Sequence, residues 1–529
     1  MPATLSYPGV YIEEVPSGVR TITGVATSIT AFVGRAPRGP ADDDETSPVR
    51  VSSYAEYERT FGGLSADSPM SHAVYQYFQN GGAIALIVRI HNTGLAGTAS
   101  APLSGGGNAT FTAANVGSWS NQLRLRFDND LDPDLVAANP PATLFNLRIK
   151  DLATGVVESH RNLSINAGHP RFASAVLQQA SSLLRGPATL ASRPTPSGPP
   201  APGSTDPFTD PSALAVAAPA NADGSAVSAN QLHAGAGLRA AKRGLYRLER
   251  ADLVNLIVIP PYTASTDLSK TDWDAVVSYA RERRAMVLVD APAAWATAAA
   301  PAAVGAVSAA ITRSENAALF FPRLLMANPL HDQRVESFPP AAAVAGVLAR
   351  TDASRGVWKS AAGIDATLSG ALGLSVPLTD LENGAINQEG VNCLRSFPTA
   401  GTVVWGSRTL KGADNLASEW KYLAVRRMAL FLEESLYRGT QWVVFEPNDE
   451  PLWAQIRLNL GAFMQNLFRQ GAFQGRSPRE AYFVRCDKET TTQTDINNGV
   501  VNIQVGFAPL KPAEFVVIRL QQMAGEIPT

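Results

Sequence analysis

Strand-like and helical segments alternate between residues 240 and 350, and this alternation constrains the fold more than any other feature of the sequence. The segments read, in order, as a strand at 253–259, a helix at 273–284, a strand at 285–289, a helix at 297–313 and a strand at 318–326. Strand–helix–strand units of these lengths form right-handed crossovers within a parallel sheet. We therefore expect an α/β unit here.

The flanking regions have a different pattern. In the first 95 residues we expect strands at 25–34 and 83–89, and two helices between them that end at Gly62-Gly63 and Gly81-Gly82. After residue 414 we expect amphipathic helices at 415–437 and 450–470, then strands at 481–486 and 500–505. With 529 residues the chain is long enough for several domains. The expected fold class is multidomain, combining α+β and α/β parts.

Residues 95–240 contain short β-like runs between Gly, Asn and Pro turns, which predicts a small antiparallel unit, with a helix at 171–184. The stretch 186–225 is rich in proline and has almost no large apolar side chains. Such a segment buries too little surface to offset its ordering entropy, so we expect a mobile surface loop.

Both ends of the chain carry β-prone runs with no neighbouring strand to pair with. The first lies between Pro8 and Pro16; the second follows Pro509 and Pro512. A lone strand exposes unpaired backbone groups, and such strands commonly add to the sheet edge of another chain. The candidate residues for this strand exchange are Tyr11, Ile12, Glu13, Glu14, Val15, Phe515, Val516, Val517, Ile518, Arg519 and Leu520.

The order and spacing of several motifs closely resemble the sheath subunit of contractile phage tails and related injection systems. At the N-terminal end these are the run PGVYIEEV at residue 8, TSITAFVGRAPRGP at 27, YERTFGG at 57 and YQYFQNGG at 75. The segments 415–437, WVVFEPN at 442 and 509–520 resemble the C-terminal part of the same family. The resemblance covers roughly the first 95 and last 130 residues.

This resemblance implies a core sheath domain built from both N- and C-terminal segments, with an insertion between them and extended terminal arms. The expected division is an N-terminal arm (1–20), the first part of the core domain (21–95), a variable β-rich insertion (96–240), an α/β domain (241–350), the second part of the core domain (351–508) and a C-terminal arm (509–529).

The resemblance also implies a function. Sheath subunits stack as hexameric rings around an inner tube, then contract from a metastable extended state and drive the tube through a target envelope. The implied partners are other copies of the chain, the inner tube protein, and baseplate and tail terminator or cap proteins. We expect assembly in the bacterial cytoplasm, as part of a phage tail or tail-like particle, without nucleic acid, direct membrane insertion or cofactors.

The composition excludes several other classes. A net charge of −2 argues against a large nonspecific nucleic-acid surface. Two cysteines, Cys393 and Cys486, indicate buried thiols in a reducing compartment. The N-terminal residues show no secretory signal pattern, and 291–312, although uncharged, is mostly alanine with two prolines.

The sequence contains no convincing catalytic or metal-binding motif. The six histidines include no pair at metal-ligand spacing on a helix, and no phosphate-binding or nucleophile-elbow motif is present. Asp290 could be an acid at a strand end, and Glu446, Asp449 and Glu450 could suggest a cation site. For all of these, turn formation or helix capping is the simpler interpretation.

Two alternative functions remain open from the sequence. One is an α/β enzyme or ligand-binding protein with unusual termini. The other is a different self-assembling particle protein, such as an adhesin or shell subunit.

Overall fold

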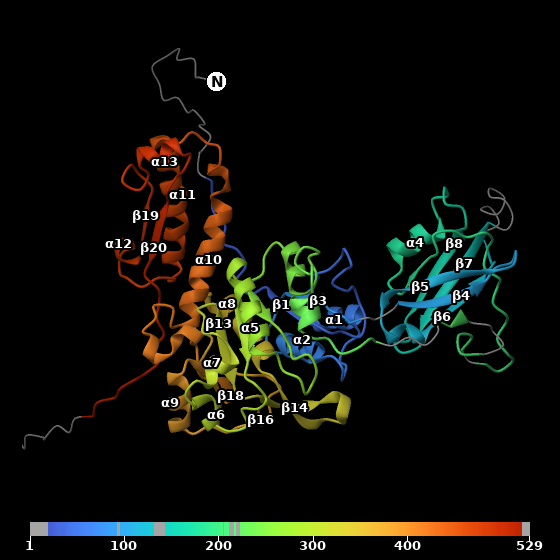
Figure 1. Ribbon diagram of the computed structural model, residues 1–529, viewed down its shortest axis with the longest axis horizontal. Helices are drawn as coiled ribbons and strands as arrows, with labels where there is room; N and C mark the ends of the chain where they lie inside the picture. The colour runs from blue at the N-terminus through green and yellow to red at the C-terminus, as the bar shows by residue number, and fades with distance from the viewer. Residues whose placement is uncertain are drawn as a thin grey trace, which may run out of the picture.

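Strands from three distant parts of the sequence form one eight-stranded sheet at the centre of the computed structural model (Figure 1). The structure describes residues 20–92, 96–131, 143–204, 206–210, 216–217 and 223–520. The strand order is β18-β17-β13-β12-β11-β1-β3-β2. In that order the strands span Gly401–Val404, Val391–Phe397, Ala317–Phe321, Met286–Asp290, Leu256–Val258, Thr30–Gly34, Ala85–Arg89 and Val49–Val51.

The strands from β17 to β3 run parallel, and the edge strands β18 and β2 are antiparallel to their neighbours. The predicted parallel sheet is therefore confirmed. β1 pairs directly with both β11 and β3, so the segment 21–95 and the segment 241–350 share one sheet. Short-range sequence patterns could not reveal this, because the pairing joins residues more than 200 positions apart.

Helices cover both faces of this sheet. Phe32 and Leu288 face a core that includes α2 (Pro69–Gln79) and α8 (Ala341–Arg355). Val33 and Val289 face the opposite core, which includes α5 (Lys270–Glu282). Side chains alternate between the two faces of a strand, so strands covered on both faces must be apolar throughout. α1 (Tyr54–Phe61) ends at Gly62, as predicted, in the left-handed conformation with φ 94°.

Two predicted elements are each divided in the structure. The helix expected at 297–313 is two short helices, α6 (Ala299–Ala302) and α7 (Ala306–Ala310), because Gly305 between them has φ 80°. The strand expected at 318–326 is interrupted at Pro322, which has no N–H to donate. Its second half, β14 (Leu324–Asn328), instead forms a small antiparallel sheet with β15 (Arg334–Phe338) and β16 (Gly373–Leu374).

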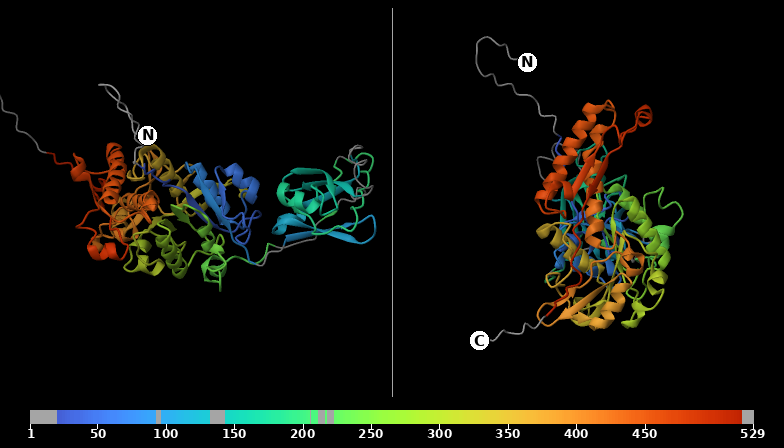
Figure 2. Two further views of the ribbon diagram at one scale, coloured as in Figure 1. Left: turned by 90° about the horizontal axis from the view of Figure 1, so that it is seen from above. Right: turned by 90° about the vertical axis from the view of Figure 1, so that its left-hand side faces the viewer.

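The insertion is a separate antiparallel unit, as predicted (Figure 2). One sheet contains β4 (Ala96–Pro102), β5 (Asn108–Val116) and β9 (Leu184–Arg185); the other contains β10 (Val216–Ala217), β6 (Leu123–Asp128), β7 (Leu144–Asp151) and β8 (Val157–Ser164). The predicted helix at 171–184 is shorter, because α4 (Ala173–Ala180) ends before β9.

Arg89 joins the insertion to the central sheet. This buried side chain donates hydrogen bonds to the carbonyls of Ala36 and Gly39, at 2.9 and 2.8 Å, and to the carbonyl of Val116 in the insertion, at 2.8 Å.

The proline-rich stretch is partly attached to the insertion, in contrast to the predicted mobile loop. The Thr195 N–H donates to the Pro102 carbonyl, and the Ser197 N–H donates to the Phe127 carbonyl, both at 2.8 Å. Individual backbone hydrogen bonds to the strand ends thus order its first part without a large apolar core.

The C-terminal part is an α+β unit beside the central sheet (Figure 1). It contains α11 (Glu450–Arg469), α12 (Pro478–Ala481), α13 (Gln493–Asn497) and a hairpin of β19 (Tyr482–Arg485) and β20 (Gln504–Phe507). The long helix α10 (Leu423–Gly439) connects it to the sheet domain, since Leu430 packs in the sheet core and Leu432 packs against α11. The helix α10 begins eight positions later than predicted, and the final strand lies a few positions later than predicted.

None of the helices in the described part of the chain combines the length and hydrophobicity needed to cross a bilayer. α9 (Asp380–Gln388) completes the sheet domain beside β17.

Candidate functional site

The first described residues lie along the C-terminal unit before the chain enters the central sheet. The Arg20 N–H donates to Asn459 Oδ1 on α11 at 3.1 Å, and the Val25 N–H donates to Ser435 Oγ on α10 at 3.2 Å. The predicted exchange residues Tyr11, Ile12, Glu13, Glu14 and Val15 precede this segment and lie outside the described residues. The first described residues of the chain, from Arg20 to Val25, are thus held on the C-terminal unit and on α10.

The C-terminal arm follows strand β20 of the β19–β20 hairpin. The Ala508 N–H donates to the Ala481 carbonyl at 2.8 Å, and the Gln474 N–H donates to the Ala508 carbonyl at 2.9 Å. Pro509 forms an isolated bridge with Phe473. These contacts hold the base of the arm on the C-terminal unit.

Five residues further on, the Glu514 carboxylate binds to the sheet domain. Arg408 contacts it with two nitrogens, Nε at 2.6 Å from Oε1 and a terminal nitrogen at 2.8 Å from Oε2. Asn387 Nδ2 donates to Oε1 at 2.9 Å, and the Tyr422 hydroxyl donates to Oε2 at 3.2 Å. We call Arg408, Asn387 and Tyr422 the Glu514 site.

Electrostatics favour the ionised carboxylate at this site. Partial burial raises the pKa of Glu514, but the hydrogen bonds from Arg408 and Asn387 outweigh that effect and hold its pKa below the usual value. Sequence reasoning missed this site, because its three members come from separate elements. The only sequence signal was an acidic residue immediately before an apolar run.

The predicted residues Phe515, Val516, Val517, Ile518, Arg519 and Leu520 follow directly and extend away from the subunit (Figure 1). Their apolar members are 73–94% exposed, and none of the six belongs to a strand of the described chain. The run is therefore a β-prone segment that pairs with no strand in the part of the chain that the structure describes.

The β19–β20 hairpin offers candidate edges for such a segment. Its register pairs Tyr482 with Phe507 and Arg485 with Gln504, and in the described part of the chain neither strand has a second neighbour. α11 covers one face, where the Tyr482 hydroxyl donates to Gln465 Oε1 at 2.8 Å. A two-stranded sheet with open edges can accept further strands.

Two of the acidic residues considered from the sequence, Asp290 and Asp449, accept N–H groups at helix N-termini. Asp290 Oδ1 accepts the Ala341 N–H at the start of α8 at 2.8 Å, and burial raises the pKa of Asp290 to about 7. Asp449 is the N-cap of α11 and accepts the Leu452 N–H at 3.3 Å. The capping interpretation is confirmed for both.

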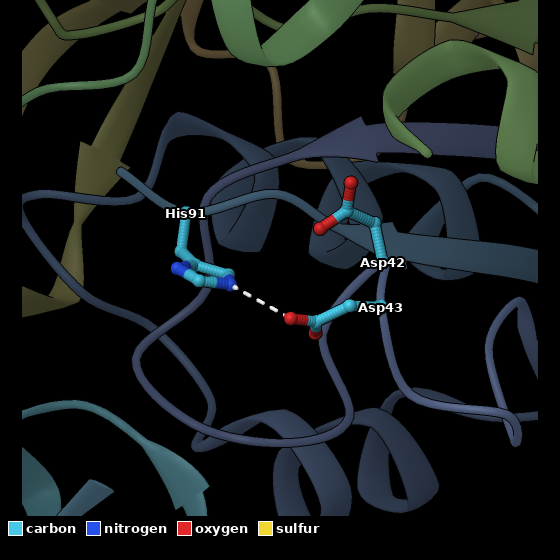
Figure 3. Close-up of side chains that lie close together, drawn as sticks. All are labelled: Asp42, Asp43 and His91. Carbon is cyan, nitrogen blue, oxygen red and sulfur yellow. Dashed lines mark ion pairs between the residues drawn. The ribbon is translucent and has the colours of Figure 1, made fainter. Parts of the chain in front are cut away.

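One group of potential metal ligands, Asp42, Asp43 and His91, comes together in the structure (Figure 3). Arg243 already lies 3.2 Å from Asp42 and 3.6 Å from Asp43, and Asp42 also accepts the Gly244 N–H at 2.7 Å. His91 and Arg243 together hold the pKa of Asp43 at about 2. The arrangement is that of an ion-pair network in which Arg243 supplies the positive charge.

Both cysteines are buried free thiols, as the composition indicated. Burial raises the pKa of Cys393 to about 12 and that of Cys486 to about 11, so neither is a reactive thiolate at neutral pH.

Comparison with known proteins identifies the family. Residues 240–410 match the family model for the phage tail sheath protein central domain, and residues 417–523 match the model for the phage tail sheath C-terminal domain. Together the two models cover more than half of the chain. The tail sheath protein of Vibrio phage KVP40 is 25% identical over 189 residues, which are 36% of this chain and 27% of that protein. The alignments span only 26–44% of the length of the curated relatives that match.

Solved structures match over nearly the whole chain. The helical sheath of the anti-feeding prophage in its contracted state has a TM-score of 0.53 at 24% identity, covering 98% of this chain and all of that one. The sheath complex of the extracellular contractile injection system PVC, also contracted, has a TM-score of 0.53 at 21% identity and covers 98% of both chains. These likenesses show a shared fold. Because the matched families are structural tail components, they contradict the alternative of an α/β enzyme. The chain therefore belongs to the phage tail sheath protein family.

Proposed function

We propose that this chain is the subunit of a contractile sheath, which polymerises as stacked hexameric rings around an inner tube and contracts to drive that tube through a target envelope. Family membership and the full-length likeness to two contractile-system sheaths support this function. The observation on which it most depends is the exposed, mostly apolar run 515–520, which protrudes from the subunit and pairs with none of the described strands.

Contraction of this kind needs no catalytic site. The work comes from a difference in interface free energy between two packings of the same folded subunit. The subunit must then move as a largely rigid body. The buried ion pair between Arg427 on α10 and Asp352 on α8, at 2.5 Å, supports such rigidity, because it holds α10 against the sheet domain.

We propose that Tyr11–Val15 and Phe515–Leu520 join the β19–β20 sheets of adjacent subunits. Added strands satisfy their backbone groups at an open edge, and alternate side chains become buried. Each large apolar side chain of the run contributes roughly 1.5–3 kcal/mol when fully buried, before the cost of ordering the arm is subtracted. A few such contacts per subunit suffice to keep neighbours connected during contraction.

The domain division predicted from the sequence remains part of the proposal. The core domain combines the N- and C-terminal segments, and the insertion 96–240 lies on the outside of the particle. The other proposed partners are the inner tube protein and the baseplate and terminator or cap proteins. A chain of similar size and fold, at a TM-score of 0.53, occurs in the solved baseplate of the anti-feeding prophage.

Deletion of residues 1–19 tests the role of the N-terminal arm and keeps the Arg20 contact with α11. The truncated chain should be folded and soluble and should no longer polymerise. Normal sheaths from this variant, seen by negative-stain microscopy, would refute strand exchange at this end. The same images distinguish a contractile tube from another kind of self-assembling particle.

Substitution I518K tests the C-terminal arm. Ile518 is 78% exposed, so the change should leave the subunit folded, but it places a charge in the proposed shared sheet. The matched control is V304K, since Val304 is fully exposed but lies on the sheet domain, between α6 and α7. We expect polymerisation to be lost in I518K and retained in V304K. Equal polymerisation of both variants would contradict strand exchange by the C-terminal arm.

A further inference from the structure

The C-terminal arm is attached to two different parts of the subunit. Its base, Ala508–Pro509, is bound to the C-terminal unit through residues 473, 474 and 481. Glu514 is bound to the sheet domain, because Asn387 lies on α9 and Arg408 follows β18. Residues 510–513 between the two attachments line a cavity of about 890 Å³, together with Trp358 and Tyr422. The arm therefore bridges the two units without filling the space beneath it.

The Glu514 site is preformed by contacts that do not involve the arm. The Arg408 side chain is fully buried and also donates to the carbonyls of Asn387 and Gly412, at 2.8 and 3.2 Å, and to Asp414 Oδ1 at 3.0 Å. These contacts fix the guanidinium plane. The remaining donors, Nε and the second terminal nitrogen, are then directed at Glu514 on the arm. Paired contacts between a guanidinium and a carboxylate are geometrically specific and stronger than hydrogen bonds between neutral groups.

We propose that the Glu514 site is the fixed point from which the exchanged strand leaves the subunit, and that it sets the reach and direction of residues 515–520 toward a second copy of this chain. The effect of the Glu514 site on assembly rests on the proposed function, whereas the attachment of Glu514 to this site does not. Without the contact, residues 510–514 become free chain and add up to about 17 Å of reach, at roughly 3.3 Å per residue. A longer flexible arm samples a larger volume, and its effective concentration at the neighbouring sheet edge falls.

The attachment can be measured in dilute full-length subunits, before assembly. Fluorophores for single-molecule energy transfer are placed on V517C in the arm and L381C on α9, which are 79% and 89% exposed in the parent chain. The native Cys393 and Cys486 are buried and should not be labelled. The variants are E514A and E514Q. The control is E419Q, because Glu419 is exposed and has no ion pair among the described residues.

We expect a narrow distance distribution in the parent and in E419Q, a broad one in E514A, and an intermediate one in E514Q, which keeps an acceptor oxygen. Arg408 retains Asp414 and two carbonyls in these variants, so the subunit should stay folded, which circular dichroism checks. A distribution in E514A as narrow as that of the parent would overturn the proposal.

A second measurement tests the consequence for assembly. The subunit concentration at half-polymerisation should rise several-fold in E514A relative to E419Q. If the arm broadens but this concentration is unchanged, Glu514 does not set the reach of the exchanged strand. That result leaves the proposed sheath function intact, because its own test is deletion of residues 1–19.

Discussion

At the scale of single residues, Asp290 shows how a buried cap can make stability depend on pH. Its carboxyl lies at the end of β12, caps α8 and is buried, and this burial raises its pKa to about 7. A folded-state pKa above the unfolded value means that the ionised form is disfavoured in the folded protein. The penalty is absent below about pH 4, grows as the pH rises, and is complete above about pH 7.

The substitution D290N should remove this penalty and keep an oxygen that can accept the Ala341 N–H. The stability of D290N relative to the parent, measured as the difference in free energy of unfolding, should increase by about 2.5 kcal/mol from pH 5 to pH 8. Urea unfolding of dilute subunits at both pH values measures it. A difference that does not change with pH would show that Asp290 titrates normally.

Residue patterns predicted the local role of some acids but not of others. Asp449 precedes a helix that carries a proline in its first turn, so its capping role was readable from the sequence. The Glu514 site was not readable, because Asn387, Arg408 and Tyr422 meet only through the packing of α9, the loop after β18 and the start of α10. Contacts of this kind depend on tertiary structure, which periodicity does not encode.

At the scale of elements, α10 belongs to two cores and is held by a buried ion pair. Arg427 contacts both carboxylate oxygens of Asp352 on α8, at 3.0 and 2.5 Å, and also donates to the Thr27 carbonyl at 3.0 Å. Both charged side chains are only 4% exposed. The pair therefore joins three segments that are far apart in the sequence.

Removal of the Asp352 charge should destabilise the folded subunit, because the Arg427 charge stays buried without its partner. We expect D352N to lower the free energy of unfolding by about 3 kcal/mol, against almost no change in the exposed control D365N. Thermal unfolding of both variants beside the parent checks this. Equal melting temperatures would mean that water reaches Arg427 when Asp352 is neutral.

The sequence predicted the parallel strands well but not the limits of every element. Uniformly apolar runs such as Ala285–Val289 identified strands covered on both faces. The prediction of one helix at 297–313 was wrong: the alanine-rich composition favours helix, but the backbone is extended at Ala303 and has a positive φ at Gly305, which precedes the second short helix. Such a break is decided by the packing of two short helices and not by propensity.

At the scale of the whole molecule, the insertion is attached to a sheet with which it shares no strand among the described residues. The side chain of Asn92, before the insertion, donates at 3.2 Å to the carbonyl of Ala226, which follows the last strand of the insertion's sheets, so the segments that enter and leave these sheets lie close together. A short linker can therefore replace the insertion.

Replacement of residues 96–217 by a short Gly/Ser linker should leave a folded subunit that still polymerises. Stability should fall only modestly, through loss of the Arg89 contact with Val116 and the Arg38 contact with Asp151 at 3.2 Å. Circular dichroism and negative-stain microscopy test both parts. An unfolded product would show that the insertion is integral to the sheath core.

The most direct test of strand exchange between subunits is a cryo-electron microscopy structure of the assembled sheath. We predict that residues 515–520 of one subunit and residues 11–15 of another hydrogen-bond to a β19–β20 hairpin that neither of them belongs to. Sheaths of normal length in which both ends of every chain pair only within their own subunit would contradict it.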